Sequence, residues 1–199
     1  MAIKFYSEHD RSPSKEELEH LALEMVFNIR PYAEDFLAKM SQLYELVVFT
    51  AGEQDYADEI LDTLDPQGYI SHRLYRQHTV PAKDEESGVT KHYMKDLAKL
   101  GRPLETTIII DNIKENFSGQ PRNGIQILTW KNDPYDSELL YYQRLLLNMA
   151  RSGVTDLRDK LDRLRQEGLL NEQPSDFVYE ESSSLLPPQL DSDFLASAV

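Results

Sequence analysis

The run TTIIIDN at residues 106–112 decides the fold class, because it joins an apolar strand to two polar side chains. Consecutive isoleucines are typical of a strand buried on both faces, as in a parallel sheet. Asp111 and Asn112 follow at the carboxyl end of that strand. Since ligands bind beyond the carboxyl ends of strands in open α/β sheets, the run predicts a functional site just after Ile110.

A second run, ELVVFT at residues 45–50, repeats this arrangement, with a short apolar strand that ends in the hydroxyl of Thr50. Apolar spacing then predicts the neighbouring elements. We expect helices at 31–43, 56–64, 139–149 and 157–164, further strands at 72–76 and 125–128, and a polar loop at 81–88. Strands that alternate with helices predict a three-layer, Rossmann-like α/β domain with a mostly parallel sheet.

The two ends of the chain differ from this core. Apolar residues at 2–6 and 25–29 predict two short strands, and Ser14 with Glu17 forms a capping box between them, so we expect a β-hairpin with a helical tip. Residues 171–199 hold six acids and no Lys or Arg, which predicts a disordered acidic tail. The expected organisation is an N-terminal hairpin region at 1–30, an α/β core at 31–168 and the tail at 169–199.

Composition narrows the function classes. A net charge of −14 argues against binding to a nucleic-acid backbone, although a local basic pocket for one phosphate stays possible. The absence of cysteine excludes disulfides and thiolate chemistry. No run reaches the roughly 18 apolar residues of a membrane span. The first ten residues resemble neither a secretory signal nor a mitochondrial presequence, so we expect an intracellular protein of the nucleus or cytoplasm, with the mitochondrion as the alternative.

Three candidate site features have ordinary structural explanations when each is taken alone. Asp111 and Asn112 offer the oxygen ligands that Mg²⁺ prefers, but they also suit an Asx turn. Thr50 and the amides after it could hold phosphate oxygens, or Thr50 could cap a helix. Lys95 could neutralise a phosphate, or it could be a surface lysine.

Taken together, these features resemble a known family, the small C-terminal-domain phosphatases (FCP-type, NLI-interacting-factor-like) of the haloacid dehalogenase superfamily. The resemblance covers about residues 27–166 and keeps both the order and the approximate spacing of the motifs. They are RPY at 30–32, FTA at 49–51, LDP at 64–66, RLYR at 73–76, KDL at 95–97, LGR at 100–102 and IDN at 110–112.

The resemblance implies a Mg²⁺-dependent phosphatase that acts on phosphoserine or phosphothreonine proteins or peptides through an aspartyl-phosphate. In that setting Thr50 binds the transferring phosphoryl group and Lys95 balances its charge. Asn112 is implied as a Mg²⁺ ligand, with Asp111 supporting the metal shell and the catalytic site. Arg76 is implied to contact the phosphopeptide substrate.

One part of the family pattern is missing from this sequence. The family carries Asp-x-Asp-x-Thr or Asp-x-Asp-x-Val at the end of its first strand, where the first aspartate attacks phosphorus and the second transfers protons. Here no such motif precedes Arg30, and the one Asp-x-Asp, at 191–193, lies in the predicted tail. The missing strand is expected in the middle of the sheet, between the strands at 45–49 and 106–110.

Two explanations follow from this gap. The chain is an N-terminally incomplete form of an active phosphatase, or it is a genuine short product without catalysis. A short product could pair its strands directly, borrow a strand, or act as a binding module. The binding alternatives are a phosphopeptide-binding pseudophosphatase and a receptor for basic mitochondrial presequences, whose charge an acidic surface would complement. In either case we expect residues 1–199 to be inactive towards phosphate esters.

Overall fold

The computed structural model describes residues 28–85 and 87–170. Nearly all of the predicted N-terminal hairpin region and acidic tail therefore lies outside the described residues. Within the described residues the helices are α2 (Ala33–Met40), α3 (Gln54–Leu64), α4 (Glu138–Arg151) and α5 (Leu157–Gln166). The strands are β1 (Val47–Phe49), β2 (His72–Leu74), β3 (Val80–Lys83), β4 (Thr90–Met94), β5 (Ile109–Asp111) and β6 (Gly124–Gln126). Short 3₁₀ turns η1 to η5 lie at Arg76–His78, Leu97–Leu100, Leu104–Thr106, Lys114–Phe117 and Pro121–Asn123.

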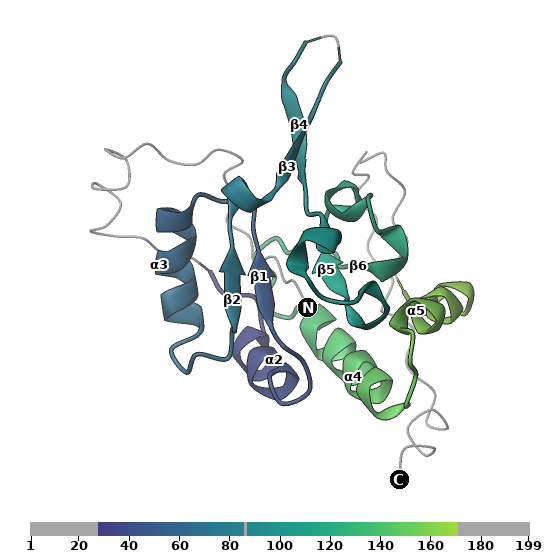
Figure 1. Ribbon diagram of the computed structural model, residues 1–199. Coiled ribbons are helices and arrows are strands. Elements are labelled where there is room, and N and C mark those ends of the chain that lie inside the picture. Colours follow the sequence, from purple (N-terminus) through teal and green to yellow (C-terminus); the bar gives the residue numbers. More distant parts are fainter. Residues whose placement is uncertain (1–27, 86, 171–199) are drawn as a thin grey trace.

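The α/β class is confirmed, and the strands form pairs instead of one continuous sheet (Figure 1). β1 pairs with β2 in parallel, with Val48 opposite Arg73. β5 pairs with β6 in parallel, with Ile110 opposite Ile125. Direct pairing of the strands at 45–49 and 106–110, one of the alternatives above, is wrong for the described residues, because β1 and β5 are not hydrogen-bonded neighbours.

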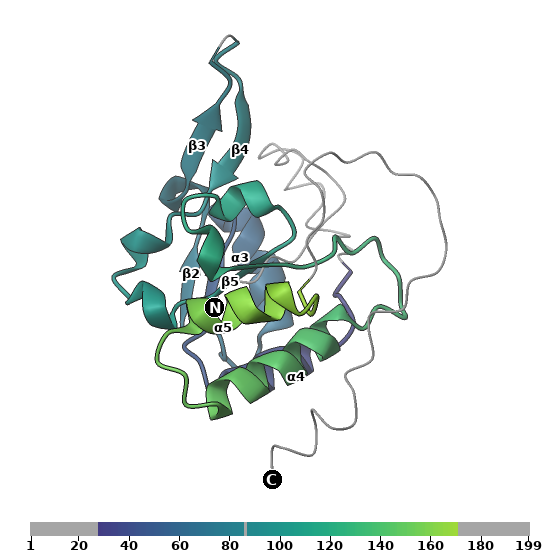
Figure 2. The same ribbon diagram turned by 90° about the vertical axis from the view of Figure 1, so that its right-hand side faces the viewer.

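The prediction of a polar loop at 81–88 is wrong for residues 81–83. Val80–Lys83 instead forms β3, which pairs antiparallel with β4, and the β3–β4 hairpin projects from one end of the molecule in both views (Figures 1 and 2). Pro81 lies opposite Tyr93, and it is tolerated because β3 and β4 pair with no other strand of the described residues, so each strand has an open edge. Alternating half-buried and exposed residues, instead of an apolar run, make this strand hard to predict from sequence.

The separate strand pairs pack together, because each of two buried clusters contains residues of both β1 and β5. Alternate residues of a strand point to opposite faces. Val48 and Ile110 therefore join the main cluster, to which all four described helices contribute. Phe49 and Ile109 join a second cluster with Leu97 of η2 and Phe117 of η4. The strand layer thus lies between α-helices and 3₁₀ turns. No helix of the described residues is both long and apolar enough to cross a membrane.

Gly124, the first residue of β6, provides a test of this packing. A Cβ atom built there would lie 2.0 Å from Cε2 of Phe117, which is 5% exposed. The ring has no space to retreat, so we expect Gly124→Ala to lower the free energy of unfolding by about 1–3 kcal/mol in urea denaturation.

Gly119→Ala is the matched control, because its Cβ would meet only the Met94 sulfur at 3.4 Å. Phe117→Leu removes the ring that the new Cβ would meet. Gly124→Ala should therefore lower the free energy of unfolding less in the Phe117→Leu background than in the natural chain. Equal midpoints for the two glycine variants would contradict this packing.

Candidate active site

The candidate site begins with a buried ion pair between Lys95 and Asp111. Lys95 follows β4 and is 1% exposed, and Asp111 ends β5 and is 0% exposed. The Lys95 ammonium donates to Oδ2 of Asp111. The sequence pattern places both residues in one site, and the structure brings them into direct contact.

Asp111 is held on its other oxygen as well. Its Oδ1 accepts from the Ile113 backbone N–H at 2.9 Å and from the Asn116 side-chain amide at 3.0 Å. Asn116 also accepts the Lys95 backbone N–H at 2.6 Å through its carbonyl oxygen. Asn116 therefore joins the two members of the pair. It was missed in the sequence because a single polar residue in a short turn has no spacing signal.

Asn112 has one satisfied and one unsatisfied side-chain atom. Its Nδ2 donates to the Thr129 hydroxyl at 2.9 Å. Its Oδ1 is buried and has no hydrogen-bond partner among residues 28–85 and 87–170. A buried amide oxygen without a partner is unfavourable unless another group supplies the missing interaction. A divalent cation would supply it, since hard cations take amide oxygens as ligands.

The donor set fits Mg²⁺ only in part. Asn112 offers a free oxygen, whereas both oxygens of Asp111 already accept hydrogen bonds. No group of three or more His, Cys, Asp or Glu side chains suited to a metal occurs in the described part of the chain. Mg²⁺ keeps several waters and needs few protein ligands, so Asn112 can supply one ligand of such a site, and further ligands must complete it.

Thr50 lies at the carboxyl end of β1, as predicted. Its backbone N–H donates to Leu74 of β2 at 2.8 Å, and its hydroxyl accepts from the Gly52 N–H at 3.0 Å. The hydroxyl proton is therefore still available to an incoming ligand. A Cβ at Gly52 would lie 3.3 Å from Oγ1 of Thr50, so a side chain there would crowd the hydroxyl.

Arg76 connects the two strand ends. Its Nε donates to the Ala51 carbonyl at 2.6 Å, its Nη1 pairs with Glu53 at 2.6 Å, and its guanidinium lies 5.3 Å from the centroid of the Tyr93 ring. Tyr93 lies on β4, and Lys95 follows the last residue of that strand. Arg76 thus links the loop after Thr50 to Tyr93 of β4, at the base of the β3–β4 hairpin.

The facing edges of β1 and β5 form the last feature of the site. Leu46, just before β1, accepts from Ser71 and His72. Thr50, just after β1, donates to Leu74, so the even-numbered positions along this strand bond to β2. The main-chain groups of Val47 and Phe49 therefore point to the opposite edge. By the same reasoning, Asp111 accepts from Ile127, so Ile108 and Ile110 present their main-chain groups away from β6. No described strand pairs with either of these edges.

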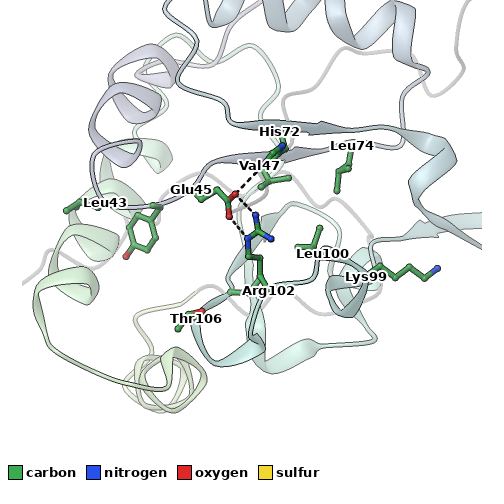
Figure 3. Close-up of a pocket in the computed structure, with 11 residues that line it drawn as sticks. Leu43, Glu45, Val47, His72, Leu74, Lys99, Leu100, Arg102 and Thr106 are labelled. Carbon is green, nitrogen blue, oxygen red and sulfur yellow. Dashed lines mark hydrogen bonds and ion pairs between the residues drawn. The ribbon is translucent and has the colours of Figure 1, made fainter.

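A cavity of about 490 Å³ lies at the amino ends of these strands (Figure 3). Val47 of β1 and Leu74 of β2 line it, together with Leu100, Thr106 and Thr107 from the segment before β5. A cluster of charged side chains, Glu45, Arg102 and His72, lies at this cavity, and dashed lines mark its contacts in Figure 3. Glu45 forms two 2.7 Å hydrogen bonds with Arg102 and lies 3.2 Å from His72. The hydrogen bonds from Arg102 lower the pKa of Glu45 to about 2.

The sequence of this chain is similar to known phosphatases. Residues 4–158 match the family described as NLI interacting factor-like phosphatase. The chain is 40% identical over 129 residues to the CTD small phosphatase-like protein 2 of Dictyostelium discoideum, covering 65% of this chain and 21% of that protein. It is 37% identical over 136 residues to the human carboxy-terminal domain RNA polymerase II polypeptide A small phosphatase 2, covering 68% of this chain and 47% of that protein.

A solved structure of the fission yeast RNA polymerase II CTD phosphatase Fcp1 aligns with 71% of this chain and 51% of that chain, at 17% identity and a TM-score of 0.49. That agreement is too weak to add to the assignment, which rests on the sequence matches. The chain spans between about a fifth and a half of the length of these two curated relatives.

Proposed function

The chain belongs to the NLI interacting factor-like phosphatase family, and on that premise we propose that its core is the scaffold of a Mg²⁺-dependent phosphoprotein phosphatase. The single observation that carries the proposal is the unpartnered Asn112 oxygen beside the buried Lys95–Asp111 pair. An amide ligand, a fixed ammonium and a hydroxyl at neighbouring strand ends are the groups that phosphoryl transfer requires around the phosphorus.

Each of these residues has a separate role in this proposal. The Thr50 hydroxyl donates to a phosphoryl oxygen while it accepts from Gly52. The Lys95 ammonium, held by Asp111, neutralises charge on the phosphoryl group and on the attacking carboxylate. Asn112 would hold Mg²⁺, which when bound supplies charge stabilisation at the phosphoryl oxygens. In this proposal Arg76 orients the loop after Thr50 and contacts a peptide substrate from the base of the hairpin.

The attacking carboxylate is absent from this set. The 199 residues contain no Asp-x-Asp-x-Thr or Asp-x-Asp-x-Val motif, and the described residues hold no group of three or more His, Cys, Asp or Glu side chains suited to a metal. We therefore propose that the nucleophile belongs to a strand lying between β1 and β5, and that residues 1–199 alone do not hydrolyse phosphate esters. Two observations support this placement: no described strand pairs with these edges of β1 and β5, and a cavity lies at the amino ends of both strands.

Phosphopeptide binding without turnover is the second candidate, since Thr50, Lys95 and Arg76 can hold a phosphate without a nucleophile. Titration of residues 1–199 with a phosphoserine peptide, its unphosphorylated form and a basic amphipathic peptide separates the readings. We expect binding of the phosphopeptide only. Thr50→Val should weaken it about tenfold, the loss of one hydrogen bond to a charged group.

Ser41→Ala serves as the control, because the hydroxyl of Ser41 bonds to the Ala38 carbonyl at the end of α2, away from the strand ends. Tighter binding of the basic peptide than of the phosphopeptide would favour the presequence-receptor reading. Equal affinity for the phosphorylated and unphosphorylated peptides would contradict the phosphoryl site.

A further inference from the structure

Residues of β6 and of the segment after it form hydrogen bonds with Asn112. The Thr129 hydroxyl accepts from its Nδ2 at 2.9 Å, and the Gln126 side chain donates to its backbone carbonyl at 3.2 Å. The β5–β6 register places Gln126 opposite Asp111. Both the main chain and the side chain of Asn112 are therefore fixed by groups from one neighbouring segment.

The hydrogen bond to Thr129 determines what Asn112 can offer. A side-chain amide has a donor end and an acceptor end that point in different directions. While the donor end is bonded to Thr129, the acceptor end is the Oδ1 atom that is buried without a partner. Without the Thr129 hydroxyl, the amide could rotate and the oxygen would lose its fixed direction.

Thr129 lies on a segment that is itself fixed. Arg30 is 8% exposed and donates through Nη1 to the carbonyl of Leu128 at 2.9 Å. The same guanidinium makes two 2.7 Å hydrogen bonds to the carboxylate of Asp136. A buried, bidentate arginine thus holds the residue next to Thr129, and the threonine hydroxyl has little freedom to follow a misplaced amide.

We propose that Thr129 is a positioning residue that fixes the side chain of Asn112, so that its Oδ1 is presented to a divalent cation. The metal half of this inference rests on the proposed function, whereas the hydrogen bond stands on the geometry alone. Groups that orient a ligand by hydrogen bonding commonly change metal affinity by about 10- to 100-fold when they are removed.

The test uses three forms of the full chain: the natural sequence, Thr129→Val and Thr129→Ser. Valine keeps the shape of threonine without its hydroxyl, and serine keeps the hydroxyl. The first readout is solvent exchange of the Asn112 side-chain amide protons by NMR. We expect exchange to be at least about tenfold faster in Thr129→Val and close to natural in Thr129→Ser. Unchanged exchange in the valine variant would overturn the proposal.

The second readout is a titration with Mn²⁺ alone, followed by paramagnetic broadening of signals around Asn112. Thr129→Val should need about tenfold more Mn²⁺ for the same broadening, and Thr129→Ser should match the natural chain. Equal Mn²⁺ response in all three forms would overturn the positioning role and leave the proposed function intact. No broadening near Asn112 in any form, including the natural chain, would overturn the metal assignment in both proposals.

Discussion

Replacing Lys95 by methionine is expected to destabilise the protein by about 3–5 kcal/mol in urea denaturation. Asp111 is completely buried, and its Oδ2 faces the Lys95 ammonium. Methionine preserves much of the lysine volume, so the loss comes chiefly from a carboxylate left in the core without its counter-charge. Removing one partner of a buried pair costs more than the pair contributes, because the remaining charge has no water to solvate it.

Two comparisons make this prediction specific. Lys91→Met removes an exposed ion pair with Asp84 and should change stability by less than about 1 kcal/mol. The double variant Lys95→Met/Asp111→Asn removes both charges and should recover a large part of the loss. A Lys95→Met variant that unfolds at the same urea concentration as Lys91→Met would contradict the buried pair at the centre of the site.

The core strands and helices could be predicted from sequence because burial leaves a direct pattern. The apolar run at 45–49 contains β1, and the run at 106–110 overlaps β5, which ends one residue later at Asp111, since strands buried on both faces need consecutive apolar residues. Each observed strand is shorter than its run, and η3 takes up Thr106 before β5 begins at Ile109. The β3–β4 hairpin could not be predicted in the same way, because its residues are mostly half-buried or exposed and include Pro81.

The candidate site could be predicted in its types of residue but not in its contacts. Thr50 and Asp111 were identified because polar residues at strand ends meet at one edge of a parallel sheet. The contact between Lys95 and Asp111 depends on how the segment after β4 returns to the sheet, which no local pattern encodes. Thr129 was missed, although it directly follows the strand predicted at 125–128, and the same strand-end rule would have selected it.

The second large effect concerns the strand between β1 and β5. A strand placed there would bond to the main-chain groups of Val47 and Phe49 on one side and of Ile108 and Ile110 on the other. Phe49, Ile108 and Ile110 are buried, and no described strand pairs with these edges. A buried main-chain group without a partner costs about 1–3 kcal/mol, so we expect the added strand to raise stability. A strand that ends in Asp-x-Asp-x-Thr would also bring its carboxylates to the edge that holds Thr50, Lys95 and Asn112.

The experiment adds a strand that ends in Asp-x-Asp-x-Thr to the N-terminus of residues 1–199 and measures urea stability and activity. Its control carries the same added strand with the first aspartate replaced by asparagine. The asparagine form should fill the gap and raise the urea midpoint as much as the aspartate form does, but it should not form the aspartyl-phosphate. Comparing the two separates the structural effect of the strand from its chemistry.

The most direct test is the hydrolysis of p-nitrophenyl phosphate with Mg²⁺ by residues 1–199 and by the same chain with this strand added at its N-terminus. We predict no detectable turnover by residues 1–199, and a rate at least about 10³-fold higher with the aspartate strand, as expected when a covalent nucleophile is restored. Turnover by residues 1–199 above the rate without protein would contradict this account, because the nucleophile would then lie within these 199 residues.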